Sequence, residues 1–356
     1  MATEIVDSNI EDDLGTQVAA VAAAGGELEI RGGGSKTFYG EAIEALPLEV
    51  GLHSGVIDYD PAELVITLRA GCRLRDVETL LAEHRQMLGF EPPCFGEEAT
   101  IGGTVASGLA GPRRAYAGAV RDFVLGVKII DGRGDIQRFG GRVIKNVAGF
   151  DVARLMVGSL GTLGVILEIS LRVIPMFESE LTLAFEHSDA AGHIRWINQL
   201  GGQPLPLSAS LWLDGVSHIR LSGSEQGVEQ AAAGLGGERA DPCWRAVNDQ
   251  THDFFSGNEP ISRASLPPAS DDLSSGHAQL IEWGGAERWL RGEIDVTGLR
   301  AGLEAGGGNL CAFRRHAPGT PVFHPLSAEM LKLQRSIKSS FDPAGIFNPG
   351  RIYPEL

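Results

Sequence analysis

Glycine-rich segments constrain the fold of this chain more than any other feature of its sequence. Of 356 residues 48 are glycine, about 13% against the roughly 7% of average proteins. Three such segments lie in the first half of the chain, at 30–37, 99–112 and 143–166. Glycine has no Cβ, so these segments let the backbone come close to a ligand. No Gly-X-Y period is present, which excludes a collagen helix.

Charge and cysteine usage exclude several classes of protein. The 30 Lys and Arg against 46 Asp and Glu give a net charge of −16, which argues against nucleic-acid binding because phosphate contacts need clustered cations. The cysteines form no CxxC pair and the histidines no HxH or HExxH spacing, so we expect no iron–sulfur cluster and no metal site. No membrane span and no targeting leader are expected, since 155–177 is interrupted by Glu168 and Arg172 and the N-terminus is acidic.

Hydrophobic spacing predicts both helices and strands, and therefore an α+β fold. A capping box at Ser8 and Glu11 predicts a helix that ends at Gly25, and 73–86 and 326–341 also have helical spacing. Segment 100–111 is expected to form a tight turn and a short helix. The expected strands cover 28–31, 64–69, 120–139 (two strands around a turn), the end of 158–174, and 309–315.

Composition changes near residue 178 and indicates a domain boundary. All five tryptophans lie between residues 196 and 289. Segment 256–277 is rich in Ser, Pro and Asp and is predicted to be a long loop. We expect a glycine-rich ligand domain at 1–177, a middle domain at 178–321, and a tail at 322–356 that the composition assigns to neither.

The segment IRGGGSKT at 30–37 has the composition of an anion-binding loop. Three glycines after a strand let consecutive N–H groups turn toward an anion, and Ser35, Lys36 and Thr37 add hydroxyl and ammonium donors. The segment is no Walker A loop, because Ser35 precedes Lys36, and no GxGxxG motif, because Thr37 takes the last glycine place. By itself it is equally compatible with an ordinary glycine turn.

The other two segments strengthen the ligand-site interpretation. The small residues of 99–112 allow a flat or phosphorylated ligand to approach, with a tightly packed small-residue helix as the alternative. In 143–166, Lys145 and Asn146 supply polar donors, and glycines punctuate the approach to a strand. Three such segments within 170 residues are hard to explain by turns alone.

Four segments carry a resemblance to a known family: IRGGGSK (30–36), ATIGGTVASG (99–108), IKNVAGFDVARLMVGSLGTLGVI (144–166) and DPAGIFNPGRIYP (342–354). They resemble the FAD-binding domain of the vanillyl-alcohol-oxidase/PCMH flavoproteins and, among these, the GlcE type of glycolate oxidase subunits. The resemblance implies a PCMH-type FAD-binding domain of two α+β subdomains at 1–177 and a smaller α+β middle (cap) domain at 178–321. It also implies that the tail at 322–356 returns to the FAD domain.

The same resemblance implies which residues bind FAD. Backbone N–H groups from Arg31 to Lys36 would hold the pyrophosphate, and the segment around Gly161 would pass near the adenine and ribose. The full set implied is Arg31, Gly32, Gly33, Gly34, Ser35, Lys36, Thr100, Ile101, Gly102, Gly103, Ser107, Lys145, Asn146, Gly161, Thr162, Gly164, Val165, Ile166 and Asn348.

Departures from the family pattern refine the expectation. Some members attach FAD covalently through a histidine directly after the glycine run, but this chain has Ser35 there, so we expect FAD to be held non-covalently. Larger hydroxyacid-oxidising relatives carry a motif resembling GDGNLH. This chain has GGGNLC at 306–311, with Gly307 and Cys311 in place of the acidic and imidazole groups.

The residues leave open whether the chain is catalytic by itself. Oxidation of a 2-hydroxyacid needs a base, a cation for the carboxylate and the flavin as hydride acceptor. The candidates are Arg314, Arg315, His316 and His324. A solvated basic turn, or a contact with an acidic partner, is the favoured interpretation of this cluster.

We therefore expect the FAD-binding subunit of a multi-subunit glycolate oxidase, which converts glycolate to glyoxylate. Its implied partners are a larger flavoprotein subunit and an iron–sulfur subunit, and its own role is to relay electrons or support assembly. The alternatives are a self-sufficient FAD-dependent oxidoreductase for glycolate or D-lactate, and a non-catalytic scaffold that has lost flavin. We expect a cytoplasmic location, with any association at the inner face of the membrane made through partners.

Overall fold

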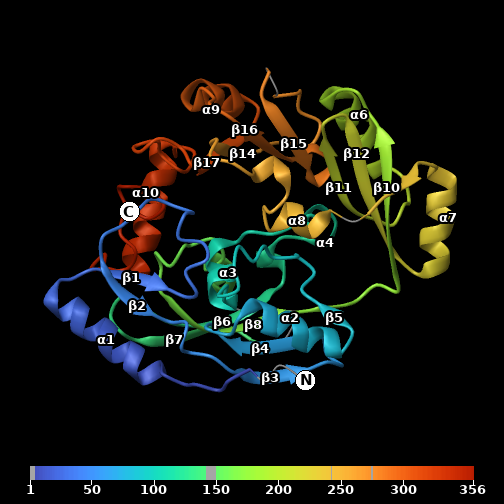
Figure 1. Cartoon of the computed structure of the whole chain (residues 1–356). Helices are drawn as coiled ribbons and strands as arrows, with labels where there is room; N and C mark the ends of the chain where they lie inside the picture. The colour runs from blue at the N-terminus through green and yellow to red at the C-terminus, as the bar shows by residue number, and fades with distance from the viewer. Residues whose placement is uncertain (1–4, 142–149, 242, 274–275) are drawn as a thin grey trace. The chain divides into compact units, whose positions relative to one another are not determined.

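The computed structural model describes residues 5–141, 150–241, 243–273 and 276–356, and the chain divides into two compact units. Unit 1 comprises the residues up to 110 together with 118–176 and 325–356, and unit 2 comprises 111–117 and 177–324. Figure 1 shows unit 1 mainly in blue and green with the red C-terminal helix, and unit 2 mainly in yellow and orange. The sequence places 111–117 within the first domain, whereas in the structure these residues group with unit 2.

A five-stranded antiparallel sheet forms the core of unit 1. Its order is β3-β4-β8-β6-β7, and the central strand β8 (Val165–Arg172) is buried at six of its eight positions. Such a strand is apolar on both faces, which explains the near-continuous run VILEISL. The other strands are β3 (Val56–Asp60), β4 (Val65–Arg69), β6 (Val124–Ile130) and β7 (Ile136–Gly140).

Short elements complete unit 1. A parallel pair joins β1 (Leu28–Arg31) to β2 (Leu46–Glu49). The remaining elements are α1 (Glu11–Ala24), α2 (Leu74–Glu83), β5 (Gln86–Met87), α3 (Ile101–Ser107), η1 (Val120–Asp122), α5 (Val152–Leu155), β9 (Ile174–Pro175) and α10 (Ala328–Phe341).

The predicted capping box at Ser8 is wrong. Helix α1 begins at Glu11 after Ile10, which makes no side-chain cap. The N–H of Glu11 is instead accepted by Asn9 Oδ1 at 3.1 Å, while Ser8 pairs with Ser54 as an isolated bridge. The bridge holds Ser8 in an extended conformation and keeps it out of the helix.

Unit 2 contains an eight-stranded sheet with helices packed on it. The strand order is β13-β10-β12-β11-β15-β16-β14-β17. The strands are β10 (Ser179–Glu186), β11 (Leu207–Leu213), β12 (Val216–Gly223), β13 (Glu238–Arg239), β14 (Ile261–Ser265), β15 (Ala278–Glu282), β16 (Glu287–Arg291) and β17 (Asn309–Arg314). The helices are α4 (Arg114–Ala117), α6 (Ala190–Gly201), α7 (Glu225–Leu235), α8 (Trp244–Asn248) and α9 (Val296–Ala305), with short turns η2 (Asp253–Phe255) and η3 (Trp283–Gly285).

Strand β14 corrects the prediction of a long loop over 256–277. Its residues, ISRAS, mix polar and apolar types and carry little strand signal of their own. Pairing with β16 on one side and β17 on the other holds them extended. The long-range ladder therefore overrides a weak local preference.

Among the described residues, no helix combines the length and the apolar character needed to cross a membrane. No group of three or more His, Cys, Asp or Glu side chains in that part of the chain is arranged to hold a metal ion. All four cysteines are free thiols.

Candidate functional site

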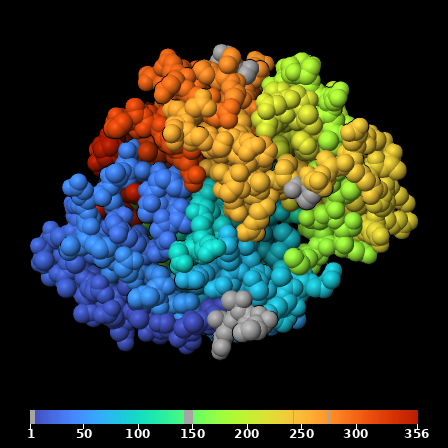
Figure 2. All heavy atoms as spheres, viewed as in Figure 1, coloured from blue at the N-terminus to red at the C-terminus, as the bar shows by residue number. Residues whose placement is uncertain are grey.

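A cleft in unit 1 brings the glycine-rich segments together. It encloses about 870 Å³, part of it open to solvent, and is lined by residues 29–37, by both ends of α3, by the 160–166 segment and by the C-terminal tail. Figure 2 shows blue N-terminal and red C-terminal atoms of unit 1 beside a hollow on this face of the molecule.

The first wall of the cleft requires glycine because of its neighbours. A Cβ at Gly32 would lie 2.4 Å from Thr100 Oγ1, and one at Gly33 would lie 1.4 Å from the carbonyl oxygen of Glu98. Backbone cannot yield to a side chain at that distance. The loop 31–36 therefore packs its main chain directly on segment 98–100, and its other side faces the cleft.

Helix α3 forms the second wall. Thr100 caps it by accepting the N–H of Gly103 at 3.2 Å, and Gly102 packs against Ala70, whose Cβ would lie 2.7 Å from an added Cβ. Gly103 differs, because an added Cβ would meet only Thr100 Oγ1, at 3.3 Å. Helix α3 is therefore tightly packed at Gly102, as one alternative expected, and both of its ends also line the cleft.

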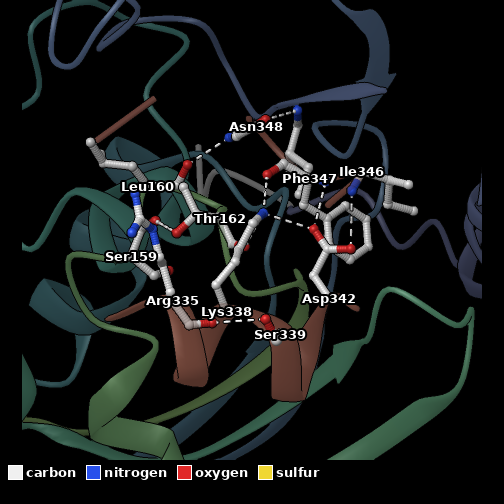
Figure 3. A network of polar contacts seen from close by, with 11 residues as sticks. Ser159, Leu160, Thr162, Arg335, Lys338, Ser339, Asp342, Ile346, Phe347 and Asn348 are labelled. Atoms are coloured by element: carbon white, nitrogen blue, oxygen red, sulfur yellow. Dashed lines mark hydrogen bonds and ion pairs between the residues drawn. The ribbon is translucent and has the colours of Figure 1, made fainter. Parts of the chain in front are cut away.

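The third wall is the 160–166 segment, and Asn348 ties it to the first wall. Its Oδ1 accepts the N–H of Ile30 at 2.7 Å, and its Nδ2 donates to the carbonyl of Leu160 at 2.6 Å. Figure 3 shows Asn348 reaching Leu160. Each of its two amide atoms thus holds one wall of the cleft.

Cations dominate the charge around the cleft. Lys36 lies over the ring of Phe95 at 5.8 Å, and Arg31 pairs with Glu29. Arg351 donates to the carbonyls of Thr37 and Glu41 at 2.7 and 2.8 Å. Among the described lining residues, three cations stand against one carboxylate. With backbone N–H groups between them, they suit an anionic ligand.

Most of the predicted cofactor residues line this one cleft. They are Arg31, Gly32, Gly33, Gly34, Ser35, Lys36, Thr100, Gly102, Gly103, Ser107, Gly161, Gly164, Ile166 and Asn348.

A few predicted residues lie elsewhere. Ile101, Thr162 and Val165 are buried behind the cleft and do not line it. Lys145 and Asn146 lie outside the described residues.

The sequence also missed part of the lining. The additional residues are Glu29, Ile30, Val50, Ala70, Ala106, Leu160 and Arg351, while Thr37, expected as a donor of the anion-binding loop, lines the cleft too. Most of them adjoin a glycine-rich segment, and Arg351 lies in the tail motif near Asn348. Their closeness in sequence to these motifs could therefore have predicted that they line the cleft.

The candidate catalytic arginines of unit 2 make structural contacts. Arg315 donates to the carbonyls of Phe255, Gly257 and Glu259 at 3.0, 2.8 and 2.8 Å. Arg314 lies 5.9 Å from the Phe313 ring, and burial lowers its pKa to about 10. Arg315 therefore braces the segment that precedes β14.

The candidate histidines are also engaged. His316 Nε2 lies 3.1 Å from both Ser262 Oγ and the carbonyl of Ile261. Because that carbonyl can only accept, Nε2 carries the proton. His324 Nδ1 accepts the N–H of Leu310 at 3.3 Å. Burial lowers the pKa of both rings. The four residues share one edge of the sheet, but each has separate contacts there.

Unit 2 buries a histidine that the sequence did not single out. His193 is 0% exposed, and its Nδ1 lies 2.7 Å from Ser217 Oγ, which in turn lies 3.0 Å from His187 Nδ1. Burial lowers the pKa of His193 to about 3, helped by charge at His187 and Arg288. The ring is therefore neutral at physiological pH.

Unit 2 also buries a carboxyl group, that of Glu287 on strand β16. Glu287 pairs across the ladder with Glu282, and the two are 3% and 4% exposed. Burial raises the pKa of Glu287 to about 7, while the charges of Arg263 and Arg114 lower it. Glu282 accepts the indole N–H of Trp289 at 2.9 Å. No local sequence signal identified either carboxyl as buried.

Comparison with known proteins identifies the family to which the chain belongs. A family model described as "FAD binding domain" matches residues 5–140. The chain is 45% identical over 333 residues to "Glycolate oxidase subunit GlcE" of Escherichia coli (strain K12), covering 92% of this chain and 93% of that protein.

More distant relatives share the domain or the fold. The chain is 35% identical over 139 residues to "Glycolate oxidase subunit GlcD" of Bacillus subtilis (strain 168), covering 38% of this chain and 29% of that protein. It is 25% identical over 387 residues to "D-lactate dehydrogenase" of Archaeoglobus fulgidus, covering 92% and 86%. A solved alkyldihydroxyacetonephosphate synthase aligns with a TM-score of 0.67 at 14% identity over 95% of this chain and 75% of that one. The last match shows the fold alone.

Proposed function

This chain belongs to the GlcE family of FAD-dependent 2-hydroxyacid oxidoreductases, and on that premise we propose that it is the FAD-binding subunit of a glycolate oxidase. The cleft of unit 1 is the proposed FAD site. The observation that carries this proposal is the convergence of three glycine-rich segments on one cleft with a cationic surround.

The proposed contacts follow from the chemistry of the lining. The backbone of 31–36, with Lys36 beside it, would offset the charge of the pyrophosphate. Gly103 and Ser107 leave room for a flat ring because neither carries a large side chain. The added-Cβ position at Gly103 is open apart from Thr100 Oγ1, which supports a ligand lying against this part of the wall. When bound, FAD would supply the hydride acceptor and electron carrier.

Non-covalent attachment is part of the proposal. Ser35 follows the glycine run, where some family members have a histidine. The described residues that line the cleft include no histidine, cysteine or tyrosine, which supports non-covalent attachment.

The proposed partners are a larger flavoprotein subunit, which oxidises glycolate to glyoxylate, and an iron–sulfur subunit. The names of the GlcE and GlcD relatives support a complex of several subunits. Since His316 and Arg315 are held by β14 and the segment before it, we assign this chain an electron-relay or assembly role. Any membrane association would be made through partners.

A second candidate function is favoured by one observation. The similarity to a D-lactate dehydrogenase extends over 92% of this chain, so unit 2 is included in it. The chain would then oxidise glycolate or D-lactate by itself. A scaffold that has lost flavin is disfavoured, because a chain freed from FAD has no need for an open cleft walled by glycine.

The test is the visible absorption spectrum of the chain expressed alone, recorded before and after anaerobic addition of glycolate and of D-lactate. An oxidised flavin spectrum that persists supports the relay or assembly role, and bleaching supports the second candidate. Absence of flavin both here and in the complete complex would overturn both.

Two controls accompany this test. Acid precipitation should release the flavin into the supernatant if it is held non-covalently. Gly103→Val, whose Cβ would meet only Thr100 Oγ1 outside the helix's own backbone, should lose flavin and stay folded.

A further inference from the structure

Lys338 is a buried charge in unit 1 that the cleft does not use directly. It is 7% exposed and lies in helix α10. Its ammonium group donates to the carbonyls of Thr162 and Phe347 and to Asp342 Oδ2, at 2.8, 2.7 and 2.7 Å. All three N–H bonds are thereby satisfied. Figure 3 shows Lys338 at the centre of these contacts.

Asp342 is buried with it and organises the turn that follows the helix. The carboxyl is 1% exposed. Its Oδ1 accepts the N–H of Ile346 at 3.0 Å, and its Oδ2 accepts the N–H of Phe347 at 2.8 Å. A buried ion pair stabilises a fold poorly compared with apolar packing. What this pair provides is one fixed path for residues 342–347.

That path leads the tail onto strand β1. Leu28 donates its N–H to the carbonyl of Ile346 at 2.7 Å, and its carbonyl accepts the N–H of Asn348 at 2.9 Å. Asn348 then bonds Ile30 in the first wall of the cleft and Leu160 in the third. The hydrogen bond from Lys338 to the carbonyl of Thr162 is a second contact between the C-terminal region and the third wall.

Arg351 extends this hold to the far end of the glycine loop. Besides Thr37 and Glu41, it donates to the carbonyl of Tyr39 at 3.0 Å. The N–H of Glu41 returns to the carbonyl of Arg351 at 2.8 Å. The tail therefore contacts the chain on both sides of the glycine loop 31–36, through Asn348 before it and Arg351 after it.

We infer that Lys338 and Asp342 are positioning residues for the cofactor cleft: by fixing segment 346–351 they set the spacing between the glycine loop and the 160–164 wall. FAD affinity then depends on an ion pair that does not line the cleft. This inference rests on the proposed FAD site.

The first test is Lys338→Met, compared with Lys332→Met on the same helix. Lys332 is exposed, so its variant controls for the loss of one positive charge. In titrations of the flavin-free protein with FAD, Lys338→Met should raise the dissociation constant about tenfold or more, since it leaves Asp342 buried without its cation. Lys332→Met should change it less than about twofold. Equal affinities in the two variants would overturn the inference.

A double-mutant cycle separates positioning from general destabilisation. Asn348→Ala is introduced into the natural protein and into Lys338→Met. If Lys338 acts through Asn348, the second substitution should cost much less FAD affinity in the Lys338→Met background. Independent, additive losses would mean that Lys338 only stabilises the fold.

Hydrogen exchange of the natural protein needs no variant to fold. The amides of Ile30, Phe347 and Asn348 should open with one free energy and should be slowed together by FAD. Tail amides that open separately from Ile30 would overturn the inference even in a protein that binds no FAD, whereas common opening with no effect of FAD would instead count against the proposed cofactor site.

Discussion

Unit 1 forms much of its cleft from main chain, whereas unit 2 buries two ionisable side chains, one on helix α6 and one on strand β16. Several residues of the cleft have no side chain because neighbouring backbone leaves no space for one, as at Gly33. In unit 2 the corresponding polar groups are His193 and Glu287, each nearly inaccessible to solvent. Where backbone packs on backbone, as at Gly33, no added atom fits, while a buried ionisable side chain couples the stability of its unit to pH. The two units should therefore fail in different ways.

The largest effect is expected at Gly33. Its added Cβ would lie 1.4 Å from a backbone oxygen, so Gly33→Ala should destabilise unit 1 by more than about 4 kcal/mol and abolish flavin retention. Flavin content and urea unfolding measure this. All five tryptophans lie in unit 2, so their fluorescence reports whether that unit stays folded. Normal flavin content in Gly33→Ala would contradict the assignment of the loop.

His193 should make unit 2 sensitive to acid. Its pKa is lowered to about 3 in the folded protein from 6.5 when unfolded, so the unfolded chain binds the extra proton and stability falls as pH falls from 6.5 toward 3. The loss is about 4 kcal/mol over the full window. His193→Gln should reduce the difference in tryptophan-monitored stability between pH 7 and pH 4. An unchanged difference would show that the ring is not held neutral.

Glu287 should act in the opposite direction. Its pKa is raised to about 7 from 4.5 when unfolded, so the folded protein holds the extra proton and stability falls as pH rises from 4.5 to 7, by about 3 kcal/mol. The groups that face it are Arg263, Arg114 and Glu282. Glu287→Gln should remove this slope, and its stability should exceed that of the natural protein most clearly above pH 7. If the variant still loses stability as pH rises from 4.5 to 7, another titrating group causes that loss.

The smallest effect is expected at a helical glycine of unit 2. An added Cβ at Gly302 in α9 meets nothing within 4 Å. Gly302→Ala should therefore stabilise unit 2 by about 0.5–1 kcal/mol, because alanine loses less backbone entropy on folding. Thermal unfolding followed by tryptophan fluorescence measures the gain. A loss of stability would show that glycine in unit 2 is as constrained as glycine in the cleft.

The predicted family and the α+β fold with an FAD-binding domain are confirmed by the comparisons. Non-covalent FAD, the iron–sulfur partner and the roles of individual site residues stay predictions. The strands that the sequence located best are those with their own apolar runs, such as β4 and β8.

The glycine-rich segments alone predicted the main walls of the cleft, because a close approach of backbone to its neighbours has few substitutes for glycine and is therefore visible in the residues. The folded structure was needed to find that Arg351 lines the cleft beside Asn348, that ISRAS is the strand β14, and that His193 and Glu287 are buried. Each of these depends on partners far away in the chain. Pairing and burial are properties of the folded neighbourhood, and the residue type at one position does not encode them.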